Sequence, residues 1–238
     1  MNIGEIFGDA LRYPFSNIKA LALYVVLGII GGLLGGTTII TAAYATILKG
    51  PLSFTFAGIG ILGLIVTIIV LLLINGYALD IIKFGIEKRE DGPGIDIGRQ
   101  IVNGLRLIVV DIVYYIVPVI IFFILGLFFR HWIMMIISIV LFFVFTLADL
   151  MAHCRLAKSD SLGEALAIGD AIGDISIVGA GKLIGSLIII AIILILITVI
   201  IVFIAAMNKT FGAIILGIAS VYFVFFYNRV IGLLYSDV

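Results

Sequence analysis

Six long apolar stretches constrain this chain more than any other feature of its sequence. They lie at about residues 20–46, 54–78, 107–129, 132–150, 183–206 and 211–233. A helix needs about 20 apolar residues to cross the hydrocarbon core of a bilayer. The stretches are apolar on every face, unlike the alternating strands of a membrane barrel. Only 12% of the 238 residues are charged, against about a quarter in soluble domains. We therefore predict an all-α, polytopic membrane protein with six transmembrane helices.

The basic residues divide unevenly between the two sides that these spans define. Eleven of the 14 Lys and Arg residues fall in the N-terminal segment, the two long connections and the C-terminal segment, and the other three are Lys49, Arg130 and Lys209 in short loops. Basic loops stay in the cytoplasm. We therefore predict a multi-pass protein of the cell (plasma) membrane with both termini cytoplasmic. Because the first apolar stretch follows a charged segment, we expect no cleavable signal peptide.

Three short segments share a pattern that is typical of a capped amphipathic helix. Each has a capping residue, an aliphatic residue, glycine and a charged residue: Asn2-Ile3-Gly4-Glu5, Asp96-Ile97-Gly98-Arg99 and Ser161-Leu162-Gly163-Glu164. Asn, Asp and Ser are favoured caps, and the first and third segments resemble capping boxes. Apolar residues recur on one helical face of each segment, and in the third we place Asp170 and Asp174 on the polar face. We predict three cytoplasmic amphipathic helices that lie in the interface or pack under the bundle.

Together, the amphipathic helices and the spans predict an internal repeat. Each unit has one amphipathic helix and two spans, in a single membrane domain (1–238) with units of about 1–92, 93–160 and 161–238. Two spans return the chain to the same side, so the units are parallel and related by a pseudo-threefold axis along the membrane normal. The alternative is chance similarity among short segments of biased composition. The polar segment 91–111 then combines a flexible turn, Asp91-Gly92-Pro93-Gly94, with the second amphipathic helix.

Three acids near the ends of the spans are the candidate functional residues. Asp111 lies five residues after Arg106, about 7 Å farther along a helix and just inside the hydrocarbon. Acids inside a membrane face protein or water and are candidate site residues. The alternative, which we favour, is a shallow carboxylate that reaches the interface or pairs with a neighbouring Lys or Arg. With Asp80 and Asp149, Asp111 could ring a cytoplasmic vestibule around the pseudo-axis.

Other motifs point away from catalysis and cofactors. Asp149 and His153 share a helical face at i,i+4 and could join a metal site, but we favour interfacial hydrogen bonding, because no second His is predicted on that side. Cys154 is the single cysteine, which excludes an internal disulfide. No Ser-His-Asp set or His-Glu-x-x-His motif is visible. We expect no enzyme activity, cofactor or metal, and the net charge of zero gives no case for nucleic-acid binding.

Gly28, Gly32 and Gly36 recur at four-residue spacing in the first span. Small residues at this spacing let two helices approach closely. We favour packing within the bundle. The sharper alternative is a face for self-association, which would give a homo-oligomer.

Three quoted stretches carry a resemblance to a known family: "GDALRYPFSNIKAL" (8–21), "GYALDIIKFGIEKREDGPGIDIGRQIVNGLRLIVVDIVYYIVP" (76–118) and "SLGEALAIGDAI" (161–172). The chain resembles an uncharacterised archaeal membrane-protein family, domain of unknown function 4013. It departs from the family pattern in its Gly-rich linker and at Asp80, where a basic residue is more usual. The resemblance implies a six-span membrane protein and carries no activity.

Three classes of function remain, of which an enzyme has the least support because no catalytic set is visible. The first is a non-enzymatic membrane module that organises lipids or partner proteins, which the nearly polar-free span centres favour. The second is a small-solute or ion transporter or channel that uses acids near the cytoplasmic side, which the parallel repeat and Asp111 favour. The partner common to both is the lipid bilayer, and a homo-oligomer or a membrane-protein partner fits the first.

Overall fold

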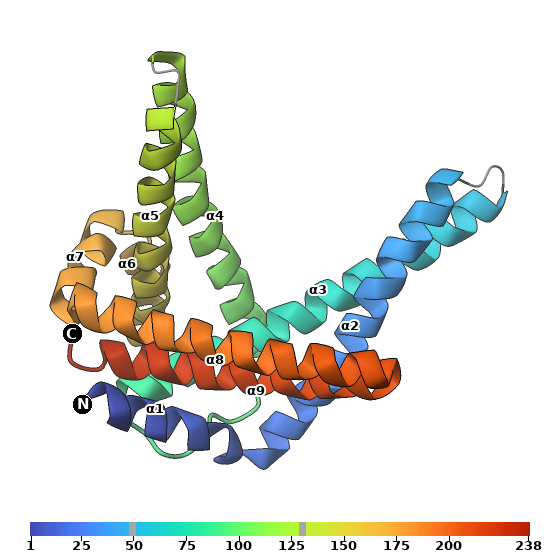
Figure 1. Ribbon diagram of the computed structural model, residues 1–238, viewed down its shortest axis with the longest axis horizontal. Helices are drawn as coiled ribbons and strands as arrows, with labels where there is room; N and C mark the ends of the chain where they lie inside the picture. The colour runs from blue at the N-terminus through green and yellow to red at the C-terminus, as the bar shows by residue number, and fades with distance from the viewer. Residues whose placement is uncertain (48–50, 129–131) are drawn as a thin grey trace.

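The computed structural model describes residues 1–47, 51–128 and 132–238, and their secondary structure is helical (Figure 1). The elements are α1 (Ile3–Arg12), η1 (Tyr13–Phe15), α2 (Ile18–Ile47), α3 (Pro51–Ile86), α4 (Ile97–Phe128), α5 (Trp132–Ser159), α6 (Leu162–Ala165), α7 (Ile168–Val178), α8 (Ala180–Met207) and α9 (Lys209–Tyr235). Helices α2, α3, α4, α5, α8 and α9 are each long and apolar enough to cross a membrane. The predicted all-α protein with six candidate spans is confirmed. The short loops around Lys49 and Arg130 lie outside the described residues.

The six long helices form three hairpins, α2–α3, α4–α5 and α8–α9, that diverge from a common end (Figure 1). We call that end the base (residues 1–24, 70–115, 145–190 and 221–238) and the remainder of the hairpins the arms. Both termini lie at the base, where the Met1 amine is 3.6 Å from the Asp237 carboxylate. This places the two termini on one side, as predicted. The assignment of that side to the cytoplasm stays a prediction.

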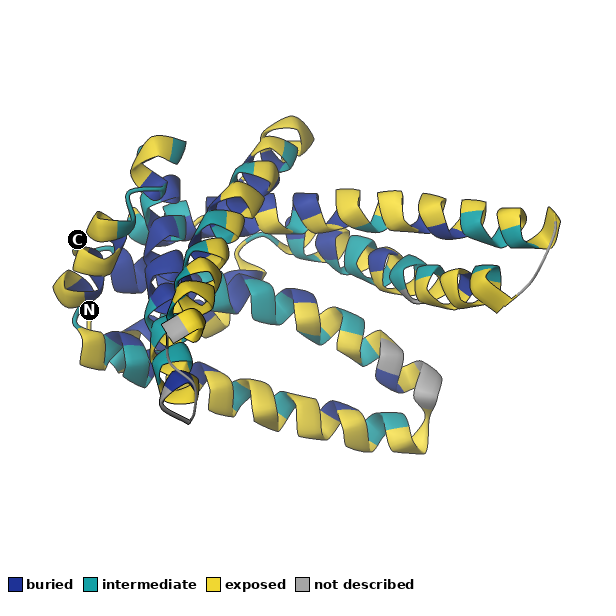
Figure 2. Ribbon diagram, turned by 90° about the horizontal axis from the view of Figure 1, so that it is seen from above, coloured by how far each residue is buried: buried dark blue, intermediate teal, exposed yellow. Residues whose placement is uncertain are grey.

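The buried apolar core lies at the base. Among the described residues, every buried hydrophobic side chain belongs to the base except Met134 and Ile201. Figure 2 shows the same gradient, with buried positions gathered where the hairpins meet and exposed positions dominating toward the tips. The protein is therefore packed at one end of its spans and open at the other.

The three predicted caps are present. Asn2 and Glu5 form a reciprocal capping box. The Asp96 carboxylate accepts a hydrogen bond from the Arg99 amide at 3.0 Å, and the Ser161 hydroxyl accepts one from the Glu164 amide at 3.4 Å. Side chains of these types satisfy amides that have no partner within the first helical turn.

The helices that follow the caps differ from one another. In the first segment, η1 with its Pro14 separates α1 from α2. We predicted that the second segment forms a separate helix, and this is wrong. The segment forms the first turns of α4, which continues through Arg106 without a break. Gly104 lies two residues before Arg106, but no Pro falls at that junction, so the backbone hydrogen bonds of the helix can continue through it. The third segment divides into α6 and α7, and α7 ends at Val178, before Gly179, whose positive φ of 93° suits glycine.

The amphipathic faces also point in different directions. Helix α1 buries its apolar face, including Ile6 and Phe7, against the base. The first turns of α4 do the opposite: Ile97 is 60% exposed, whereas Asn103 on the polar face is buried. In α7, Asp174, which we predicted on a polar face, is buried. Leu166 and Ala167 separate α6 from α7, so the continuous helical face assumed from the sequence does not exist.

Glycines let the helices of the base approach closely. A Cβ atom on Gly76 of α3 would overlap the carbonyl group of Gln100 in α4. A Cβ atom on Gly85 would lie 2.9 Å from the Cα atom of Gly232 in α9. Residues with side chains cannot occupy these two crossings without moving the backbone.

The predicted glycine face of α2 has mixed surroundings. A Cβ atom on Gly28 would lie 3.0 Å from the Val221 side chain in α9, whereas one on Gly32 would meet nothing within 4 Å. The surroundings of Gly36 lie outside what the structure describes. Self-association through this face stays a prediction.

Candidate functional sites at the base

Three groups of ionic contacts tie the hairpins to the amphipathic segments. Asp80 of α3 pairs with Arg99 at the start of α4, at 3.0 Å. Arg155 of α5 pairs with Asp170 and Asp174 of α7, both at 3.1 Å.

The third group joins the last helix, α9, to the first, α1. Arg229 of α9 is 1% exposed and contacts Asp9 of α1 through two hydrogen bonds of 2.6 and 3.1 Å. The base end of each hairpin's second helix is thus bound to the next amphipathic segment along the chain, and the last hairpin contacts the first segment.

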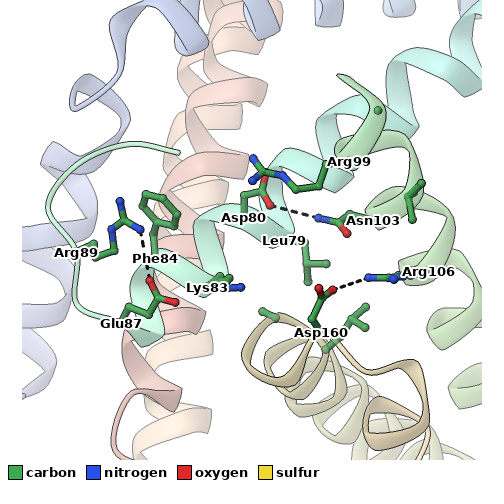
Figure 3. A pocket seen from close by; sticks show the side chains of 14 residues that line it. Leu79, Asp80, Lys83, Phe84, Glu87, Arg89, Arg99, Asn103, Arg106 and Asp160 are labelled. Carbon is green, nitrogen blue, oxygen red and sulfur yellow. Dashed lines mark hydrogen bonds and ion pairs between the residues drawn. The ribbon is translucent and has the colours of Figure 1, made fainter. Parts of the chain in front are cut away.

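One cavity of about 490 Å³ lies between α3, α4 and the end of α5 (Figure 3). Asp80 lines it and is held by Arg99 and by the Asn103 side chain, whose amide donates at 3.3 Å. Arg106 bonds to Asp160 at the α5 end of the same cavity. Lys83 also lines it, and it has no carboxylate within ion-pair distance among the described residues. The cavity therefore combines four basic side chains with three acidic ones.

A second cavity, of about 350 Å³, holds the other two candidate acids. The His153 Nε2 atom lies 2.8 Å from the Asp111 Oδ1 atom and 3.6 Å from the Asp149 Oδ1 atom. Asp149 is 5% exposed, and its Oδ1 atom has no hydrogen-bond partner. Helices α4 and α5 supply these three side chains, while α3 and α9 complete the wall. A buried carboxylate oxygen without a partner is costly, which makes this cluster a candidate functional site.

The structure brings together two of the three predicted acids. Asp111 and Asp149 share a cavity, whereas Asp80 faces Arg99 in the neighbouring one. The acids therefore do not surround one common space, because the hydrogen bonds to Asp80 hold it in the other cavity. Asp111 pairs with His153 of the same hairpin, and among the described residues it has no Lys or Arg within ion-pair distance. The sequence showed the i,i+4 pair of Asp149 and His153 but contained no local signal for their contact with Asp111.

The linker between α3 and α4 is held to the base. The Tyr13 hydroxyl donates to the Asp91 carbonyl at 3.1 Å, and Tyr77 and Asn17 donate to the Pro93 carbonyl at 3.1 and 2.9 Å. Burial raises the pKa of Tyr13 above its ordinary value, so its hydroxyl stays a donor. The hydrogen bonds from Arg89 lower the pKa of Asp91. The turn that we predicted to be flexible is fastened by three side chains from outside it.

The helices and their exposed apolar surface define a polytopic helical membrane protein. A family model described as "Protein of unknown function (DUF4013)" matches residues 59–206. The chain belongs to this family, in agreement with the resemblance seen in its sequence. The match includes the stretches 76–118 and 161–172, whereas 8–21 lies outside it. Searches of the curated proteins and of the solved structures found no match.

Proposed function

We propose that the protein is a non-enzymatic membrane module that organises lipids or partner proteins around its arms. The observation that carries this proposal is the loss of packing along each hairpin. In α8, only 11% of the residues in its most apolar 18-residue stretch are buried. Large apolar side chains stay exposed along the arms (Figure 2). Helices that diverge offer more surface to acyl chains or to another protein than helices packed along their whole length.

The cavity around Asp80 supports the lipid form of this proposal. Lys83, Arg99 and Arg106 line it at the base, next to apolar helical surface. Arg99 and Arg106 are paired with Asp80 and Asp160, so Lys83 is the cation that these two pairs leave for a headgroup. Basic pockets between transmembrane helices bind anionic headgroups. An anionic lipid could place its headgroup there and its chains along α3 and α4, whose flanking residues Val102 and Leu105 are exposed.

We also propose that the chain is a tandem repeat with units of about 1–92, 93–160 and 161–238, and that the base faces the cytoplasm. The succession of ionic contacts supports the repeat: α3 to α4, α5 to α7, and α9 to α1. Chance similarity of short segments gives no reason for an arginine–carboxylate contact at each junction, although at α3–α4 the acid is on the hairpin helix and at the other two it is on the segment. The excess of basic residues at the base supports the orientation.

A second candidate function is a small-solute or ion transporter. The cluster of Asp111, Asp149 and His153 favours it, because ionisable groups within transmembrane helices often line ion or proton pathways. This function would require the cluster to communicate with both sides of the membrane.

The test of the proposed function is native mass spectrometry of the full chain extracted in its own lipid patch, without detergent. We expect an anionic lipid or a protein partner at fixed stoichiometry. The Lys83→Gln variant should retain less anionic lipid, whereas Lys19→Gln, which alters an exposed basic residue outside the cavity, should retain as much as the unmodified protein.

Flux measurements distinguish the two candidate functions. In vesicles, a transporter would move a cation or solute and would lose this activity on Asp149→Asn. Such flux, together with protein released from the lipid patch without any lipid or partner, would overturn the proposed function. Retained lipid without flux would support it.

A further inference from the structure

We propose that Asp111, Asp149 and His153 form a binding site for one divalent first-row transition-metal ion of the zinc type. This inference does not depend on the proposed function. It departs from our expectation, based on the sequence, that the chain has no metal site, because the sequence alone did not place Asp111 beside the other two residues.

The positions of the three side chains fit a metal ion. Their nearest ligand atoms all lie within 4.8 Å of one another. Bonds of about 2.0–2.2 Å to a tetrahedral Zn²⁺ ion place two ligand atoms about 3.4 Å apart. The separation of 3.6 Å between His153 Nε2 and Asp149 Oδ1 agrees with that value. The 2.8 Å between His153 Nε2 and Asp111 Oδ1 must widen by about 0.6 Å. An ion that replaces this hydrogen bond would require a change of that size.

The unsatisfied oxygen of Asp149 is the second observation that points to a ligand. Asp149 is only 5% exposed. Its Oδ1 atom lies 3.6 Å from His153 Nε2 and has no hydrogen bond. Two other buried acids of the base, Asp80 and Asp174, each have an arginine partner. In the described part of the chain, the ionic contact of Asp149 is His153 alone. A bound cation would supply the partner that the arginines supply elsewhere.

Charge and ligand type indicate the class of ion. Two carboxylates and a neutral imidazole carry two negative charges, which a divalent ion neutralises. Imidazole suits Zn²⁺ and its first-row neighbours, whereas Mg²⁺ prefers an all-oxygen octahedron. Three protein ligands leave a fourth position for water. Asp111, whose side chain is 44% exposed, lies where an ion could enter.

The experiment uses the full chain in nanodiscs of zwitterionic lipid, stripped with a chelator and titrated with Zn²⁺ alone. Calorimetry and metal analysis should give one Zn²⁺ ion per chain, after subtraction of nanodiscs without protein. Asp149→Asn and His153→Gln should each weaken binding by about tenfold or more, because each removes a ligand. Asp80→Asn is the matched control: it alters another buried acid of the base and should leave Zn²⁺ affinity unchanged.

Two further readouts keep the proposal falsifiable. X-ray absorption of the zinc-loaded protein should give a shell of nitrogen and oxygen with one imidazole. If Asp149→Asn fails to fold, Asp111→Asn replaces it, because that side chain is partly exposed. The proposal is overturned if the unmodified protein binds no Zn²⁺ at fixed stoichiometry, if folded ligand variants bind it equally well, or if the shell contains sulfur. In these cases the cluster is a hydrogen-bonded group only.

Discussion

The base and the arms belong to the same helices, yet different forces stabilise them. At the base, arginine–carboxylate contacts and close glycine crossings join all three hairpins. In the arms, the contacts lie mainly within a hairpin, as where Gly60 and Gly63 of α3 lie against Thr41 and Thr38 of α2. In lipid there is no hydrophobic drive between helices, so they associate only where packing or polar contacts favour it. The hairpins meet where the sequence supplies such contacts and separate where it supplies apolar side chains alone.

The largest effect should come from filling a glycine crossing at the base. Gly76→Leu places a side chain where the Gln100 backbone lies, so α3 and α4 cannot keep their crossing. We expect loss of the folded protein, measured as aggregation in size-exclusion chromatography. Gly126→Leu in the α4 arm, where a Cβ atom would meet nothing within 4 Å, is the control and should fold. Equal behaviour of the two variants would remove the distinction between base and arms.

The next largest effect should come from breaking the contact between α9 and α1. Arg229→Met removes a buried guanidinium from Asp9 and leaves that carboxylate without its partner. Removing one member of a buried ion pair costs about 3–5 kcal/mol. The measurement is the free energy of unfolding in a detergent titration. Lys88→Met, which removes an ion pair between half-exposed side chains, should change it much less. A similar loss in both variants would argue against a special role for the buried contact.

A smaller effect should follow from separating the two helices of one arm. Gly63→Leu forces its side chain against Thr38 and the Leu34 carbonyl, and such overpacking costs about 1–3 kcal/mol. We expect α2 and α3 to move apart in the arm while the base stays folded. Distances between spin labels at Ile39 and Leu62, both exposed, would reveal the movement. Gly58→Leu on the same helix, where a Cβ atom has open space, should leave the distances unchanged.

The smallest effect concerns pH at the surface of the base. The hydrogen bond from Lys88 lowers the pKa of Asp237. A carboxyl whose folded pKa lies below its unfolded value of about 4 stabilises the fold above that value, and the contribution is lost as pH falls through the folded pKa. The unmodified protein should therefore exceed Lys88→Met slightly in unfolding free energy at neutral pH and should match it near pH 2. A difference in unfolding free energy that persists in acid would show that it arises from packing of the Lys88 side chain and not from the ion pair.

The sequence predicted the features that depend on local chemistry. The six spans follow from apolar length, because a helix satisfies its own backbone inside a bilayer. The caps at Asn2, Asp96 and Ser161 follow from side chains that bond to amides three residues away. Neither prediction needed knowledge of what lies next to the helix.

Features that depend on neighbours could not be predicted in the same way. The patterns of α1 and of the first turns of α4 are alike, but one buries its apolar face and the other exposes it. In a membrane protein both environments accept an apolar face, so periodicity does not decide the direction. The contact of His153 with Asp111 joins residues 42 apart in the chain. It depends on how α4 and α5 rotate against each other, which no local motif records.

A helical hairpin held only at one end can tilt about that end. Helix α8 has 28 residues and is therefore about 42 Å long. A tilt of about 10° at its fastened end would displace its tip by about 7 Å. The tips lie far from the ionic contacts, which hold the hairpins at the other end. A small rearrangement of those contacts would therefore correspond to a large change in the area that the molecule occupies at its open side.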